Sequence, residues 1–251
     1  MGVDFKGWFR TGDQTKCCPL TVTDYYSRFI LCFELLSSER LNLVQEQFQK
    51  LFTRYGRPKA IRVANGRPFG GGNVLGLTQL SLQWRLAGID VQFIEPASPH
   101  QNGRHERMHL SYASELCRRP ARDVKGQKLL TRRWLKEFNY ERPHEALNMR
   151  CPAEIYVKSS LRYLQPKRPF NYADWPTRKV DKKGDLWWGN QRRFIGEAFN
   201  RYELGLKPIH PGVYELYLAD LFLGTLHDAE FFEFRPTVEI RKTPQPSPAK
   251  M

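Results

Sequence analysis

Two acidic residues in this 251-residue chain stand where a carboxylate could hold a metal ion or take part in chemistry. The first, Asp4, lies between Val3 and Phe5 in an apolar, strand-like run. A carboxylate among apolar strand residues is costly to bury unless it is paired or binds a metal. The plain alternative is an aspartate at a strand end that faces water.

The second acidic residue, Glu106, lies in the first turns of a predicted helix that follows a proline-containing loop. Its neighbours Arg104 and Arg107 are cations, and the backbone N–H groups at a helix start also favour anions. This segment could therefore bind phosphate while Glu106 coordinates a metal. An ordinary solvated helix face is the alternative.

A third segment lies between these two in the sequence and begins at residue 62. Residues 61–63 predict a short buried strand, which runs into a glycine-containing loop that starts at Asn65. Active sites of open α/β sheets lie at such strand ends. However, Ala64, directly after the strand, has only a methyl group and offers no ligand.

The elements around these segments predict a mixed α/β domain. Apolar runs within residues 3–9, 20–23 and 29–33 predict three sequential antiparallel strands, and 3.6-residue periodicity predicts a helix from residue 41 to about 52. Strands are predicted at 61–63 and 91–94, and helices at 75–86, 102–119 and 129–138. Such an order favours a mixed sheet with helices on both faces.

The rest of the chain predicts a second, β-rich domain. We divide the sequence into a core domain at 1–157, a basic proline-containing linker at 158–184, a small β-barrel at 185–236 and a disordered tail at 237–251. The barrel is predicted from short β-type runs separated by turns, at residues 186–188, 193–195, 213–217, 221–223 and 231–234. Trp187 and Trp188 are expected in its core rather than on a base-stacking surface.

Charge and cysteine usage indicate the partner and the compartment. A net charge of +14 and a pI near 9.7 favour an anionic partner, with nucleic acid as the leading candidate and a merely basic protein as the alternative. Five cysteines without a CxxC pair suit a reducing compartment. No signal-peptide pattern or membrane-length apolar run is visible, so we expect a cytoplasmic, nucleoid-associated protein without membrane contact.

Taken together, these segments resemble the catalytic core of DDE-type transposases and integrases, a family that includes retroviral integrases and, closest to this sequence, bacterial insertion-sequence transposases. The resemblance spans nearly the whole chain and depends on the order and spacing of residues 3–7, 24–28, 56–69, 99–107 and 139–156. It implies a ribonuclease H-like fold, a mixed five-stranded sheet flanked by helices, followed by a small C-terminal β-barrel.

The resemblance also implies the roles of individual residues. Asp4 and Glu106 correspond to catalytic ligands of two Mg²⁺ ions, which prefer oxygen donors and would activate first water and then a DNA 3′-hydroxyl. The residues expected to contact DNA are Arg67, Asn102, Arg104 and Arg107. His105 and His109 are expected on the polar surface or in contact with DNA, rather than at a zinc site.

The family's remaining metal-binding aspartate corresponds to position 64, where this sequence has Ala64. We therefore expect a DNA-binding protein of the transposition and integration machinery that is an inactive or weak polynucleotidyl transferase. One alternative is an active magnesium-dependent strand transferase with a substitute ligand, for which Asp90 and Glu95 are nearby in the sequence. The other is an inactive DNA-binding relic that interferes with intact transposase.

The expected partners are DNA and either further copies of this chain or an intact transposase in a mixed oligomer. Transposases of this family usually carry helix-turn-helix modules before the core, whereas here the first catalytic strand begins at residue 3. DNA binding through Lys and Arg is therefore expected to be largely sequence-independent and sensitive to salt.

Overall fold

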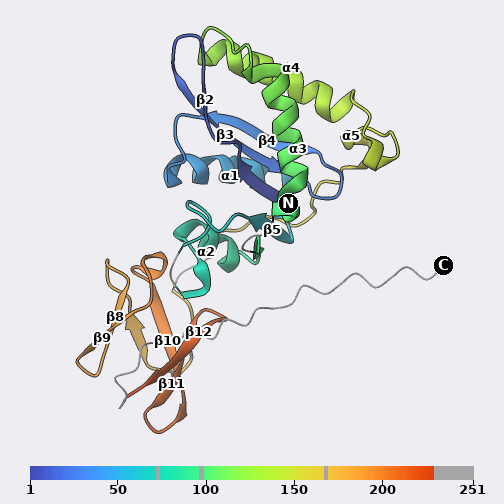
Figure 1. The fold of residues 1–251 in the computed structure, drawn as a ribbon. Coiled ribbons are helices and arrows are strands. Elements are labelled where there is room, and N and C mark those ends of the chain that lie inside the picture. Colours follow the sequence, from blue (N-terminus) through green and yellow to red (C-terminus); the bar gives the residue numbers. More distant parts are fainter. Residues whose placement is uncertain (72–73, 96–98, 167–168, 229–251) are drawn as a thin grey trace, which may run out of the picture. The chain divides into compact units, whose positions relative to one another are not determined.

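Six strands form a mixed sheet in the first part of the chain (Figure 1). The strands are β1 (Gly2–Phe5), β2 (Phe9–Arg10), β3 (Lys16–Thr23), β4 (Ile30–Leu36), β5 (Ala60–Val63) and β6 (Asp90–Phe93). β1 and β2 both pair antiparallel with β3, β4 pairs with β3 as well, and β5 and β6 continue the sheet beyond β1 in parallel. The predicted mixed sheet is confirmed. It has six strands rather than five because the first strand is interrupted near Gly7, whose φ of 90° is strained for other residues.

The computed structural model describes residues 1–71, 74–95, 99–166 and 169–228. The chain divides into a core unit, residues 1–72 with 76–167, and a second unit, residues 73–75 with 168–251. Within the described ranges, no helix is both long enough and apolar enough to cross a bilayer.

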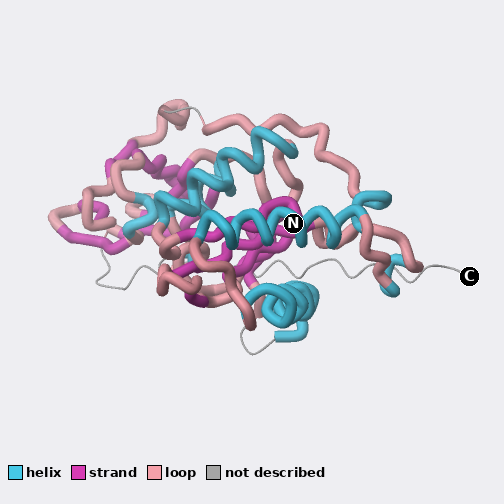
Figure 2. The backbone as a smooth tube through the Cα atoms, turned by 90° about the horizontal axis from the view of Figure 1, so that it is seen from above, coloured by secondary structure: helices cyan, strands magenta, loops and turns pink. Residues whose placement is uncertain are grey.

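Helices cover both faces of the core sheet (Figures 1 and 2). They are α1 (Leu41–Tyr55), α2 (Gln79–Leu86), α3 (Gly103–Tyr112), α4 (Val124–Tyr140) and α5 (Pro152–Ile155). A 3-10 turn (Pro99–Asn102) leads into α3, and a π turn (Ala113–Cys117) continues it. The helix predicted over residues 75–86 is shorter than expected, because Thr78 caps α2 by accepting the N–H of Ser81.

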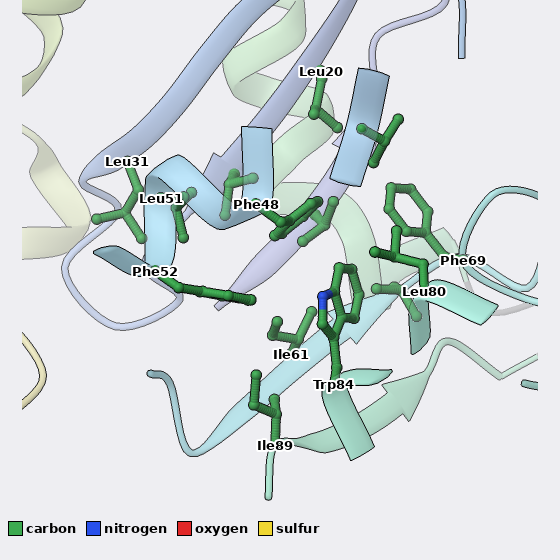
Figure 3. Close-up of a cluster of buried hydrophobic side chains, with 14 of the residues drawn as sticks. Leu20, Leu31, Phe48, Leu51, Phe52, Ile61, Phe69, Leu80, Trp84 and Ile89 are labelled. Carbon is green, nitrogen blue, oxygen red and sulfur yellow. The ribbon is translucent and has the colours of Figure 1, made fainter. Parts of the chain in front are cut away.

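The two faces of the sheet have separate apolar clusters. Side chains alternate along β3, so Leu20 and Val22 face α1 and α2, whereas Cys17 faces α3 and α4. On the first face Trp84 is 1% exposed and its ring lies 4.5 Å from that of Phe48, centroid to centroid (Figure 3). The second cluster consists of Cys17, Ile30, Phe33, Leu35, Met108, Tyr112, Trp134 and Phe138.

One side chain of α4 is bonded to the backbone of the sheet. The N–H of Ile30 donates to Oδ1 of Asn139 at 2.8 Å, and Nδ2 of Asn139 donates to the carbonyl oxygen of Ile30 at 3.0 Å. Ile30 begins β4, which pairs with β3 and with no other described strand. The amide of Asn139 therefore satisfies the backbone groups of Ile30 in place of a neighbouring strand.

The second unit contains two open sheets in its described part, so the predicted closed barrel is not observed there. The four-stranded sheet has the order β12-β11-β10-β7, and the other sheet pairs β8 with β9. The strands are β7 (Thr177–Lys179), β8 (Asp185–Trp188), β9 (Gln191–Phe194), β10 (Glu203–His210), β11 (Val213–Leu218) and β12 (Leu221–His227). The strand predicted at residues 231–234 lies outside the described residues.

The two tryptophans expected in the barrel core have different environments. Trp188 packs against Tyr214, with ring centroids 5.0 Å apart, and its indole N–H donates to Asp228 at 2.5 Å. Trp187 is 56% exposed, so the expectation is wrong for this residue. Successive residues of a strand point to opposite faces, and only the Trp188 face is covered by the rest of the unit.

Part of the segment predicted as a linker packs on the core unit. The N–H of Arg57 donates to the carbonyl oxygen of Leu161 at 2.7 Å, and the hydroxyl of Ser159 donates to the carbonyl oxygen of Arg57 at 2.6 Å. Tyr163 lies against Phe52, with ring centroids 4.8 Å apart. Residues 159–163 thus cover the end of α1.

Candidate functional site

Asp4 lies on the sheet face that α3 covers and is half-buried. Its Oδ2 accepts a hydrogen bond from Nδ2 of Asn102 at 2.7 Å, and its Oδ1 accepts the N–H of Phe5 at 2.9 Å. Burial raises the pKa of Asp4, these two hydrogen bonds act in the opposite direction, and the charge of Glu106 raises the pKa further. Asp4 is therefore already bonded within the protein through both oxygens.

Glu106 lies in the first turn of α3 and is exposed. Asn102 and His109 both lie next to Asp4. They stand four residues before and three residues after Glu106, so helix periodicity puts Glu106 on the side of α3 that faces Asp4. The fold therefore brings together two acidic residues that are far apart in the sequence. Their catalytic roles stay a prediction.

Ala64 lies directly after β5, the strand that pairs with β1. Gly2 of β1 pairs in parallel with Arg62 of β5, so this register extended by two residues would put position 64 level with Asp4. Laterally paired residues of adjacent strands point to the same face, about 5 Å apart. In this register a side chain at position 64 would lie next to that of Asp4, and here it is a methyl group.

A buried histidine, His109, lies next to Asp4. The hydroxyl of Thr21 donates to the carbonyl oxygen of Asp4 at 2.9 Å and also lies 2.9 Å from Nε2 of His109. Because that hydroxyl has only one hydrogen, Nε2 of His109 must be the donor to it. Nδ1 is then unprotonated and lies 3.9 Å from Oδ2 of Asp4. Burial lowers the pKa of His109 to about 3, so the ring is neutral and forms no ion pair with Asp4.

His105 is also buried, which corrects the expectation that both histidines lie on the polar surface. It is 1% exposed, and its Nε2 lies 3.4 Å from the hydroxyl of Thr23. Burial lowers its pKa to about 4. The ring fits only because residue 2 is glycine, since a Cβ there would lie 2.8 Å from Cε1 of His105.

The four residues predicted to contact DNA fall into two groups. Asn102 is bonded to Asp4, and Arg104 donates to the carbonyl oxygen of Tyr25. Arg67 and Arg107 are exposed, and neither has an ion-pair partner in the described parts of the chain. The second group is therefore the one free to meet a phosphate.

Tyr25 links the elements of the site and is not apparent as a functional residue from the sequence. Its ring lies between the guanidinium groups of Arg62 and Arg104, at 4.8 and 4.7 Å from the ring centroid. Its hydroxyl donates to the carbonyl oxygen of Gln101 and accepts from Arg62. Tyr25 thus fixes the start of α3, which carries Asn102 and Glu106. In the sequence, this role is indicated only by the position of Tyr25, an aromatic residue in a polar turn within a segment that resembles the family.

These residues do not fit a pair of magnesium ions. Two carboxylates are present, one is bonded to Asn102, and the position beside it is Ala64. Nδ2 of Asn65 donates to the carbonyl oxygen of Ile94 at 2.6 Å, so this amide is held away from Asp4. Throughout the described residues, no three His, Cys, Asp or Glu side chains are grouped so that they could hold a metal.

A stretch that contains α3 matches a known family. The family described as "Integrase core domain" matches residues 87–152, which include β6, α3 and α4. The matched region includes Asn102 and Glu106, and Asp4 lies before it in the sequence.

Solved structures that are similar to this chain include three from retroviruses. The simian T-cell lymphotropic virus intasome in complex with PP2A regulatory subunit B56 gamma is 14% identical, with 88% of this chain and 76% of that chain covered and a TM-score of 0.48. The HTLV-2 integrase catalytic core domain in complex with magnesium is 13% identical, with 62% and 94% covered and a TM-score of 0.44. The BIV integrase catalytic core domain is 18% identical, with 62% and 91% covered and a TM-score of 0.42.

Proposed function

We propose that this protein is a DNA-binding member of the DDE integrase and transposase family, with a ribonuclease H-like core whose strand-transfer chemistry is impaired. The observation that carries the proposal is Ala64, which directly follows β5, the strand that pairs with the strand of Asp4. A methyl group cannot coordinate Mg²⁺, which takes oxygen ligands. Losing a residue that merely orients a ligand costs roughly 10–100-fold in metal affinity or activity, so losing a carboxylate ligand should cost more.

The remaining residues support DNA binding without catalysis. Asn102 and the N–H of Phe5 donate to the carboxylate of Asp4, so the protein itself satisfies this half-buried group, whereas the neutral His109 beside it adds no charge. Arg67 and Arg107 are exposed near this edge and would meet phosphate oxygens. We further propose that the protein acts on nucleoid DNA, as a homo-oligomer or in a mixed oligomer with an intact transposase.

The proposal is tested by magnesium-dependent nicking and strand transfer, measured for the unmodified chain and for Ala64→Asp. We expect little or no activity from the unmodified chain and a gain of at least about tenfold from the variant. Ala64→Asn is the matched control, because it has the same shape but no charge and should stay inactive. Full activity of the unmodified chain would refute the impairment.

A second candidate is an active enzyme in which Glu95 is the substitute ligand. Glu95 lies two residues after the end of β6, at the same edge of the sheet as Ala64, and its side chain is exposed. Asp90 is excluded, because it begins β6 at the other end and pairs with Arg85 at 2.7 Å. If the unmodified chain nicks DNA and Glu95→Gln abolishes this activity, while Asp90→Asn does not, the second candidate is correct.

A further inference from the structure

The outer face of α4 carries a row of cations. Lys125, Arg132 and Arg133 are exposed there, opposite the buried face that contains Gln127, Thr131, Trp134 and Phe138. At 100° per residue, these three cations lie within about a third of the helix circumference. We call Lys125, Arg132 and Arg133 the α4 row. It extends along the helix for about 12 Å.

The segment before α4 adds three more exposed cations, Arg118, Arg119 and Arg122. Its backbone is fixed in place, because the N–H groups of Gly12 and Asp13 donate to the carbonyl oxygens of Ala121 and Arg122 at 2.9 and 2.7 Å. We call these three residues the 118–122 segment. The six cations all lie between residues 118 and 133, a stretch that the structure describes without a gap.

The carboxylates around these cations are already engaged elsewhere. Asp123 caps α4 by accepting the N–H of Gly126 at 2.7 Å. Glu115 and Glu137 both bind Arg142, at 2.8 and 2.6 Å. None of the six cations has an ion-pair partner among the described residues, so no salt bridge within the protein occupies their charged groups.

A surface hollow of about 580 Å³ extends along α3 and the turn that follows it. It is lined by Arg107 and Arg118, with Leu110, Ser111 and Ser114 between them in the sequence. The hollow therefore adds Arg107 to the cations that surround the 118–122 segment.

We propose that the α4 row and the 118–122 segment form a second surface that binds the phosphate backbone of duplex DNA, separate from the edge at Asp4 and Glu106. Duplex DNA presents one negative charge per ~1.7 Å, so a stretch of duplex as long as the α4 row carries roughly seven phosphates on its two strands. Lysine and arginine contacts of this kind position DNA without reading its sequence. The inference rests on the proposed DNA binding and adds where the backbone lies.

The test is the affinity of the full chain for a short duplex of random sequence, measured by fluorescence anisotropy over a salt series. The variant is Lys125→Gln/Arg132→Gln/Arg133→Gln, in which all three positions are exposed. Each lost phosphate contact lowers the slope of log K against log salt by about 0.9, so a decrease of roughly 2–3 is expected, with an affinity loss of about tenfold or more.

The matched control is Lys50→Gln/Arg54→Gln/Lys59→Gln, which removes the same number of charges from exposed positions on and after α1. We expect it to change the slope by less than about one. If both triple variants lose affinity equally, net charge alone governs binding and the α4 surface is rejected. It is also rejected if the α4 variant binds as the unmodified chain does. If the unmodified chain binds no duplex at all, the proposed function fails as well. Equal melting temperatures of both variants establish that folding is retained.

Discussion

The two units differ in where their charge lies. Residues 1–167 contain 27 Lys and Arg against 15 Asp and Glu, whereas residues 168–251 contain 13 against 11. The net charge of +14 therefore belongs almost entirely to the first of these regions. The β8–β9 hairpin of the second unit exposes aromatic residues, with Trp187 and Phe194 each 56% exposed. Electrostatic binding of DNA is thus expected mainly from the core unit.

Trp84 of the core unit is buried, whereas Trp187 of the second unit is exposed. Replacing these two residues gives the largest expected difference in stability. Trp84→Ala should destabilise the core unit by about 3–5 kcal/mol, because the indole is 1% exposed and packs on Phe48, Phe52 and Phe69. Trp187→Ala should change stability by at most about 0.5 kcal/mol. Urea unfolding followed by circular dichroism measures both. A large loss for Trp187→Ala would mean that the hairpin face is covered.

Mild acid should lower the free energy of unfolding of the core unit. The reason is that His105 and His109 are buried and neutral, with pKa values of about 4 and about 3. Below pH 6.5 the unfolded chain takes up protons that the folded core does not. Stability should therefore fall as the pH falls from 6.5 towards 4, by about 1.4 kcal/mol per pH unit for each histidine. The raised pKa of Asp4 acts in the opposite direction and offsets part of this loss.

Melting temperatures between pH 7 and 5 test this expectation. His109→Gln should roughly halve the pH dependence while its amide still reaches Thr21. His227→Gln is the control, because His227 is exposed in the second unit. A pH dependence that His109→Gln leaves unchanged would contradict the assignment to the buried histidines.

The smallest effect is expected from removing cations of the second unit. Lys182→Gln/Lys183→Gln/Arg192→Gln should lower the salt slope of duplex binding by less than about one, since Arg192 already lies 3.7 Å from Asp185. The same anisotropy titration measures it beside the α4 variant. If this variant lowers the salt slope as much as the α4 variant does, the two units contribute equally to DNA binding.

Much of the core fold follows from the sequence, because strong periodicity and alternation are local. The helix predicted from residue 41 is α1, and the one predicted at 129–138 lies within α4. β10 was missed because Gly205 and Pro208 interrupt its strand pattern. The proximity of Asp4 and Glu106 was expected from the family resemblance alone.

The burial of His105 and His109 could not be predicted. Their helix also carries Arg104, Arg107 and an exposed Leu110, so it has no clear apolar face to indicate which side is buried. Burial depends on Thr21 and Thr23, which approach from β3 only in the folded state. The bond from Asn102 to Asp4 joins residues 98 positions apart, and no local pattern encodes it.

The two hydrogen bonds between the side chain of Asn139 and the backbone of Ile30 also affect the solubility of the protein. β4 is an edge strand, and exposed backbone groups at an edge can recruit a strand from another molecule. The amide occupies both backbone groups of Ile30 and so blocks that end of the edge. Loss of this single side chain would open the start of β4 to strand addition, and self-association into aggregates would then compete with ordered assembly on DNA.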